Sequence, residues 1–236
     1  MIIFWRLMLA HMLGDFTLQF DAVAEAKRKT WWGMFIHTGT HFVLALALSW
    51  NYLGQDWVSF GGVKLGGWAA LGCMFLIHHL QDEWRIFAIR NYKTADGTIH
   101  FLWDQFVHTA AIFVFSPVIG FYTDGSIFPE KWVILGILAV FVTHFATVLV
   151  YFVEKDFYNS QFPGFDEKYF TMLQRFVLCM FFLIPGWQWL PYFGLWGGYM
   201  VYLWRQRFID FGKAGVYVGT ALALAAGIMA RRVFHV

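Results

Sequence analysis

Residues 11–20, HMLGDFTLQF, place His11, Asp15 and Gln19 at intervals of four inside an otherwise apolar segment. On a helix this spacing stacks the three side chains on one face. In the core of a bilayer, a polar side chain costs free energy unless it finds a partner. We therefore expect the partners of these residues on one side of this helix.

The chain around this segment is unusually apolar. Of its 236 residues, 59% are hydrophobic, 22% are aromatic and only 14% are charged. A soluble domain carries about 25% charged residues. The composition therefore predicts an all-α, polytopic transmembrane helical bundle with the lipid bilayer as its surroundings. Basic clusters interleaved with aromatic residues are missing from the sequence, which argues against nucleic acid as a partner.

Apolar segments of about the length that spans a bilayer, roughly 20 residues, recur along the chain. They lie at 3–20, 32–52, 67–87, 100–122, 131–153, 169–190, 192–206 and 214–232. Pro185 and Pro191 leave residues 169–206 open to two interpretations, a re-entrant pair or two short spans. We therefore expect seven or eight transmembrane helices.

The connections between these segments predict the orientation. Basic residues gather in connections 21–31, 88–99 and 204–213, whereas 53–66 and 122–130 hold almost none. The positive-inside rule places the basic connections in the cytoplasm and the N-terminus outside. With eight spans Arg231 and Arg232 lie outside, against the rule; with seven spans the 204–213 connection is unexplained. Both alternatives stay open.

The two halves of the chain differ in composition. Residues 1–115 hold seven of the nine histidines, and we expect a four-helix transmembrane domain with a His/Asp cluster there. Residues 116–236 are predicted to form aromatic-rich transmembrane helices, which could pack on another membrane protein. His144, alone on an apolar helix, is a packing residue or the axial ligand of a haem or chlorin. Arg175 is expected to snorkel to the membrane interface.

Four consecutive helices each carry two potential ligands four residues apart, on one helical face. The pairs are His11 and Asp15, His37 and His41, His78 and Asp82, and Asp104 and His108. Because the chain reverses direction at each helix, all four pairs fall about 6–15 Å below the cytoplasmic helix ends. Imidazole and carboxylate are the ligands of Zn, Fe and Mn. We expect one cluster that holds one or two divalent ions.

Other polar residues are assigned around this cluster. We expect Gln19, Gln105 and Lys27 to contact either the metal ligands or a substrate, without binding the metal themselves. Glu83, Trp84 and Arg85 at the end of their helix are interpreted as interface residues. The simpler alternative for each His/Asp pair is an interhelical hydrogen bond that fixes packing.

These motifs resemble a bacterial integral-membrane domain family of unknown function. Its members share the patterns H-x-L-x-D-F-x-L-Q, H-x-x-x-H, H-x-x-x-D and D-Q-x-x-H, which this chain matches over residues 1–115, although here Glu83 follows the third pattern directly. That family is distantly similar to bacterial membrane-bound metal-dependent hydrolases. The resemblance implies a multi-pass protein of the bacterial inner membrane and a metal role for the eight paired residues.

Three functions follow from this interpretation. The first is a metal-dependent hydrolase acting on a lipid or lipid-linked substrate, in which the metal activates water and Asp104 or Asp15 is the catalytic base. The second is a structural or assembly subunit of a larger membrane complex, packed on a partner or pigment. The third, a divalent-cation transporter, ranks below both because the cluster is displaced to one side and no repeat is evident.

Overall fold

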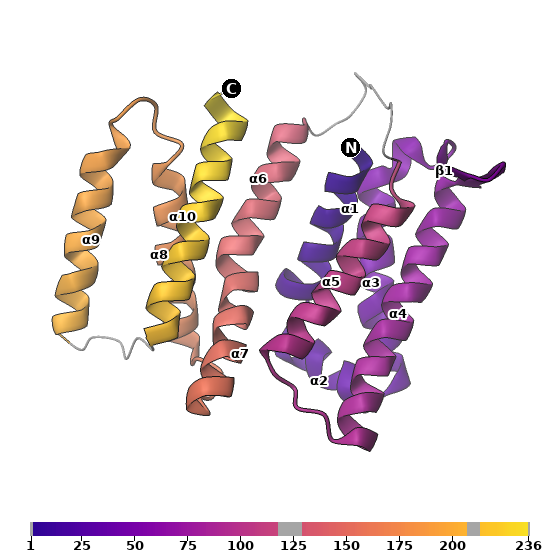
Figure 1. The fold of residues 1–236 in the computed structure, drawn as a ribbon, viewed down its shortest axis with the longest axis horizontal. Coiled ribbons are helices and arrows are strands. Elements are labelled where there is room, and N and C mark those ends of the chain that lie inside the picture. Colours follow the sequence, from indigo (N-terminus) through magenta and orange to yellow (C-terminus); the bar gives the residue numbers. More distant parts are fainter. Residues whose placement is uncertain (1, 118–128, 207–212, 236) are drawn as a thin grey trace. The chain divides into compact units, whose positions relative to one another are not determined.

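A computed structural model describes residues 2–117, 129–206 and 213–235 (Figure 1). The described chain is helical apart from one short hairpin, which confirms the all-α class. It divides into two compact units, Met1–Val133 and Ile134–Val236, whereas the sequence analysis placed the division after residue 115. The predicted connections 122–130 and 204–213, and the end of the predicted span 100–122, lie partly outside the described residues.

The first unit contains the helices that carry the four His/Asp pairs. In chain order its elements are α1 (Ile2–Met12), the π-helical turn η1 (Leu13–Thr17), α2 (Asp21–Lys29), α3 (Trp31–Ser49), the 3₁₀ turn η2 (Trp50–Tyr52), β1 (Asp56–Phe60), β2 (Val63–Gly66), α4 (Gly67–Tyr92) and α5 (Thr98–Phe115). Its apolar core joins α1, α4 and α5 to the hairpin through Ile3, Leu7, Trp57, Leu71 and Ile112. This core lies directly beside the polar cluster.

The hairpin was not predicted. Strands β1 and β2 pair antiparallel around Gly61 and Gly62, which both take the positive φ that a tight turn needs. The buried Trp57 fixes the hairpin to the helices, since its indole N–H donates to the Tyr52 carbonyl at 2.9 Å. The predicted connection 53–66 is therefore an ordered cap on one end of the first unit.

Helix α2 was also missed, because the sequence DAVAEAKRK lies in a basic connection. Asp21 in its first turn and Lys27, Arg28 and Lys29 in its last turn complement the helix dipole. Helix α3 follows at once, with the Thr30 hydroxyl accepting from the Gly33 N–H at 3.0 Å. A Cβ at Gly33 would lie 2.2 Å from the Ala26 carbonyl oxygen, so glycine is required for this tight corner.

The second unit contains a long helical stretch and three further helices. The stretch comprises α6 (Glu130–Val140), whose first residues belong to the first unit, the π-helical turn η3 (Phe141–Phe145) and α7 (Ala146–Tyr158). Helices α8 (Phe165–Phe181), α9 (Trp189–Arg205) and α10 (Lys213–His235) follow. The core contains Leu138, Val142, Cys179, Ala226 and Ala230.

Two arginines of the second unit donate hydrogen bonds to backbone carbonyls of the same unit. Arg175 does not snorkel: it is buried, and its guanidinium donates to the carbonyls of Val142 at 2.9 Å and Thr143 at 3.3 Å. A π-helical turn leaves a carbonyl without its usual helical partner, which explains the attraction. Arg231 donates to the carbonyls of Phe182, Ile184 and Gly186, so this basic residue is held by the α8–α9 connection.

Two described helices are long and apolar enough to cross a membrane by length and composition. They are Glu130–Tyr158, with mean hydropathy 2.5, and Gly215–His235, with mean hydropathy 1.3. The polar residues of the His/Asp pairs lower the hydropathy of α3, α4 and α5. By this criterion two helices of the described chain are candidate membrane spans, fewer than the seven or eight predicted.

Candidate metal centre

The eight paired residues come together in the interior of the first unit, and all eight are buried. Helix α1 and turn η1 supply His11 and Asp15, while α3, α4 and α5 supply one pair each. Two groups within this cluster bring their ligand atoms within 4.8 Å of one another. Group A is Asp15, His37, His41 and His78; group B is His78, Asp82 and His108.

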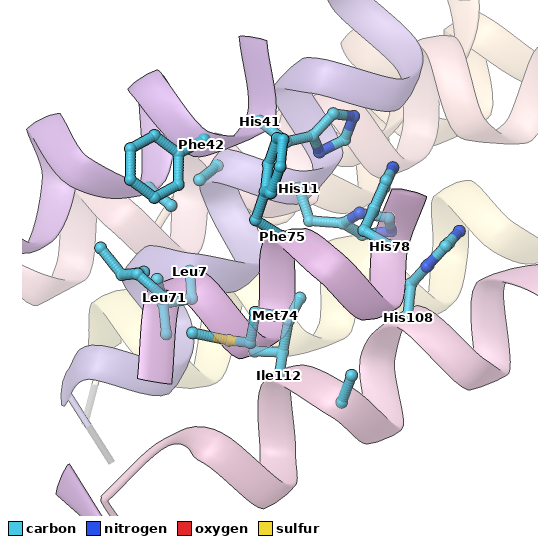
Figure 2. Close-up of a pocket in the computed structure, with 13 residues that line it drawn as sticks. Leu7, His11, His41, Phe42, Leu71, Met74, Phe75, His78, His108 and Ile112 are labelled. Carbon is cyan, nitrogen blue, oxygen red and sulfur yellow. The ribbon is translucent and has the colours of Figure 1, made fainter. Parts of the chain in front are cut away.

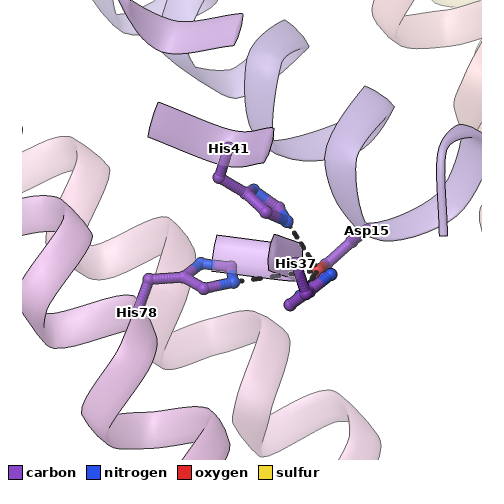
Figure 3. Close-up of side chains that lie close together, drawn as sticks. All are labelled: Asp15, His37, His41 and His78. Atoms are coloured by element: carbon purple, nitrogen blue, oxygen red, sulfur yellow. Dashed lines mark ion pairs between the residues drawn. The ribbon is translucent and has the colours of Figure 1, made fainter. Parts of the chain in front are cut away.

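Group A is arranged around one oxygen atom, Asp15 Oδ1. The Nε2 atoms of His41, His37 and His78 lie 3.1, 3.3 and 3.9 Å from it (Figure 3). Three imidazoles and one carboxylate are a ligand set that suits Zn, Fe or Mn.

Group B is arranged around the carboxylate of Asp82. Its Oδ2 lies 3.4 Å from His78 Nε2, and its Oδ1 lies 3.6 Å from His108 Nε2. His37 Nε2, from group A, is 3.3 Å from the same Oδ2. The two groups are therefore adjacent, and His78 belongs to both.

The feature of the cluster that best fits a metal site is the state of the histidine nitrogens. The Nε2 atoms of His37, His41, His78 and His108 are buried and make no hydrogen bond within the described residues. Their contacts are the ion-pair distances of 3.1–3.9 Å to the Asp15 and Asp82 carboxylates, and buried nitrogens without a well-formed hydrogen bond are rare in native proteins. Four such atoms beside two carboxylates fit the donor set of one or two divalent ions.

His11 and Gln105 form the edge of the cluster. The Gln105 amide N–H donates to Asp15 Oδ2 at 2.9 Å, and its Oε1 lies 3.1 Å from His11 Nε2. Gln105 thus orients the Asp15 carboxylate, as expected for a residue behind the ligands. His11, 3.7 Å from Asp15 Oδ2, lies outside both groups. Gln19 follows η1, and its buried Oε1 makes no hydrogen bond within the described residues.

Asp104 lies outside both groups and is held by a cation. Arg85 Nη1 donates to Asp104 Oδ2 at 3.0 Å, and Arg85 Nη2 donates to Asp96 at 2.8 Å. The interpretation of Arg85 as an interface residue stays a prediction, but the residue also pairs with two carboxylates of the first unit. Its position on α4, seven residues after His78 and three after Asp82, places it on the face that carries the pair. That spacing was the signal that could have identified it.

A second cation reaches the cluster from α2. Lys27 Nζ lies 2.7 Å from Asp82 Oδ2, and its side chain is 15% exposed where Asp82 is 2% exposed. The packed corner between α2 and α3 fixes the position of this lysine. Lys27 was predicted beside the ligands or the substrate, and it lies against a ligand of group B.

The backbone at η1 is adapted to the histidines. The Leu18 N–H bonds to the Leu13 carbonyl at 2.8 Å, which widens the turn around Asp15. A Cβ at Gly14 would lie 2.6 Å from Cε1 of His41. Glycine at position 14 therefore leaves the space that the His41 ring fills.

An apolar cavity of about 50 Å³ borders the cluster. Figure 2 shows the rings of His11, His41, His78 and His108 on one side of the cavity and Leu7, Leu71, Met74 and Ile112 on the other. The histidine cluster thus lies between an apolar space and the charged side chains of Lys27 and Arg85.

The remaining predicted residue, His144, lies in the second unit. It is half-buried, and its Nδ1 is 3.0 Å from the Thr143 hydroxyl. It belongs to neither group, and it stays a prediction as the ligand of a haem or chlorin.

Fold and site together define an all-helical protein with a buried His/Asp centre that could hold a metal ion. Residues 3–135 match the family model described as "Protein of unknown function (DUF3307)", and the chain belongs to this family. No curated protein and no solved structure gives a significant match. The predicted membership in a family of unknown function is confirmed, whereas the similarity to membrane-bound hydrolases stays a prediction.

Proposed function

We propose that the first unit binds one or two divalent transition-metal ions in groups A and B, and that it is a metal-dependent hydrolase acting on a lipid or lipid-linked substrate. The observation that carries this proposal is the convergence of four buried Nε2 atoms on the carboxylates of Asp15 and Asp82, with no well-formed hydrogen bond to any of the four within the described residues. In a hydrogen-bonded helix clamp, these nitrogens would be expected to make such bonds.

Under this proposal, two of the carboxylates bind metal and the third acts as the general base. A bound divalent ion would supply a water of lowered pKa as the nucleophile. Asp15 and Asp82 belong to the groups and would be ligands. Asp104 lies outside the groups, 3.6 Å from His108 Nε2, and would accept the proton of the attacking water. Arg85 and Gln81 hold the Asp104 side chain in place from α4.

The membrane location rests on the outer surfaces of the helices, together with the two apolar helices already described. Large apolar side chains are exposed along α3, α4 and α5, among them Trp32, Ile36, Val43, Leu76, Leu80, Trp103, Phe106 and Phe113. Soluble monomers rarely expose apolar patches of this extent. We place the chain in the bacterial inner membrane with seven or eight spans and with the basic helix α2 on the cytoplasmic side.

Metal analysis of the detergent-purified protein tests the proposal. We expect one or two equivalents of Zn, Fe or Mn in the wild type and a clear loss in His37→Ala/His41→Ala. Asp104→Asn should keep the metal and lose hydrolysis of a lipid ester or lipid-linked phosphate. A folded wild type without metal, after growth with each ion in turn, would refute the proposal.

A second role is favoured for the second unit by the surface of α9. Leu203 is its one buried residue, while Leu195, Tyr199, Tyr202 and Trp204 are exposed. Leu195, Tyr199 and Tyr202 share one face of this helix, and we propose that this face packs on a membrane-protein partner or a pigment. A photo-crosslinking residue at position 195 should give one discrete adduct in native membranes, and lipid adducts alone would argue against a partner.

A further inference from the structure

We propose that the metal-loaded centre binds a phosphate group, and that Lys27 and Arg85 are the side chains that recognise it. This inference rests on the metal binding proposed above. It narrows the substrate from any lipid or lipid-linked ester to one that carries a phosphate.

The first support is the position of the two cations. Lys27 contacts Asp82 and Arg85 contacts Asp104, and His108 Nε2 lies 3.6 Å from an oxygen of each carboxylate. The two cations, which come from different helices, are thus each paired with a carboxylate that His108 contacts.

The second support is accessibility. The side chains of Lys27 and Arg85 are 15% and 21% exposed, whereas those of Asp82 and Asp104 are 2% and 4% exposed. The cations therefore separate the buried carboxylates from the outside. A ligand that enters from this side meets the ammonium and the guanidinium first.

The third support is the charge of the site. Asp15, Asp82 and Asp104 carry three negative charges, and Lys27 and Arg85 carry two positive charges. With two divalent ions bound, the site has a surplus of three positive charges, or two when Asp96, the other partner of Arg85, is included. Uncompensated charge in a buried site is costly, so the centre loaded with two ions favours an anionic ligand. A neutral ester or sugar would leave the surplus in place.

The donor chemistry selects phosphate among anions. Arginine and lysine are the side chains that proteins use for phosphate, with strong charge-assisted hydrogen bonds. In the structure, the negative charge of Asp82 pairs with Lys27. A metal ion that takes Asp82 as a ligand would compete with Lys27 for this charge. The lysine ammonium, with three N–H donors, then remains beside the ion to bind a phosphate oxygen.

The phosphate could belong to a lipid headgroup or be free. The apolar cavity on the opposite side of the histidines would accept a few carbon atoms of a ligand that also contacts the metals. Titration with inorganic phosphate and binding of lipids in nanodiscs distinguish these two sources.

The test uses the full-length, zinc-loaded protein and calorimetric titration with inorganic phosphate. We expect binding that EDTA abolishes. Lys27→Met should weaken it by about tenfold or more while zinc content is kept. Lys29→Met is the matched control, because Lys29 lies on the same helix, is exposed and pairs with Glu25; it should bind phosphate like the wild type.

A second measurement does not depend on the Lys27 variant. In the Mn²⁺-loaded wild type, the ³¹P resonance of phosphate should broaden well beyond the broadening caused by Mn²⁺-loaded Asp82→Asn. Tighter binding of phosphatidic acid than of diacylglycerol in nanodiscs would assign the phosphate to a lipid, and equal binding of the two would assign free phosphate.

The outcomes separate this inference from the proposed function. A wild type that takes up no metal refutes the metal centre and the phosphate site together. A fully loaded wild type that shows neither phosphate binding nor ³¹P broadening refutes the phosphate site alone. Equal phosphate affinity in wild type, Lys27→Met and Lys29→Met would overturn the role of Lys27.

Discussion

The imidazole rings of His78 and His108 stack with centroids 4.0 Å apart and planes 18° apart. His78 belongs to both metal-ligand groups, whereas His108 belongs to group B alone. The two stacked residues therefore differ in what their removal does to the centre.

We expect His78→Ala to lose metal from both groups, because it removes a ligand from each. In a wild type that binds two ions, His108→Ala should keep about one ion, in group A. Elemental analysis per protein chain measures the difference.

The matched control for this prediction is the neighbouring His79→Ala. The His79 ring lies outside both groups, with Nδ1 3.2 Å from the Thr38 hydroxyl. The variant should keep full metal content. Equal metal loss in His78→Ala and His79→Ala would contradict the assignment.

Gly14→Ala should impair the centre although it replaces no ligand. The new Cβ would lie 2.6–2.8 Å from three atoms of the His41 ring, so the ring must move. Overpacking of this kind costs about 1–3 kcal/mol, and we expect weaker metal binding and a lower thermal midpoint. Gly39→Ala, where a Cβ would meet open space, should cause neither change.

Glu130→Gln should destabilise the first unit. Arg6 is nearly buried, and its Nε and Nη2 donate to Glu130 Oε1 at 3.1 and 2.7 Å. Loss of the carboxylate removes this ion pair from a buried guanidinium, and the partial exposure of Glu130 limits the cost to about 1–3 kcal/mol. Chemical unfolding in detergent measures this change.

An exposed ion pair serves as the control for the effect of Glu130→Gln on stability. Glu25 and Lys29 pair on the surface of α2, so Glu25→Gln should leave the unfolding midpoint unchanged. If Glu130→Gln behaved like Glu25→Gln, the buried pair would contribute nothing to stability.

Arg175→Met should destabilise the second unit by about 1–3 kcal/mol, because the carbonyls of Val142 and Thr143 lose a donor. Thermal unfolding followed by tryptophan fluorescence measures the loss. Arg205→Met, at the exposed end of α9, is the control and should unfold like the wild type. Equal midpoints for both variants would show that the Arg175 contacts are not needed.

The sequence predicted the helices well because their apolar lengths and the turns between them are local properties. The prediction that four His/Asp pairs face one another followed from the four-residue spacing and from the reversal of direction at each helix. Lys27 was placed near the site because it lies in the short connection between two of the pairs. What these residues bind stays a prediction, because a hydrogen-bonded clamp and a metal site use the same side chains.

The hairpin and the partners of Arg85 and Arg175 were not predicted, because they depend on contacts between residues that a local sequence pattern does not reveal. The hairpin is held by Trp57 against the Tyr52 carbonyl, and its Gly61-Gly62 turn was read only as part of a connection. Arg85 was assigned by its place at a helix end, although its actual partners, Asp96 and Asp104, follow α4 in the chain. Arg175 reaches carbonyls that are accessible only because η3 departs from regular helical geometry.

The π-helical turn at Leu13–Thr17 makes the N-terminal segment sensitive to its length. Such a turn holds one residue more than an α-helical turn. Deletion of one residue there would let a regular α-helix continue and would rotate everything before it by about 100°. Arg6 would leave Glu130, Leu7 would leave the cavity and His11 would leave Gln105. A single-codon deletion in this turn should therefore harm the protein more than any one substitution in α1.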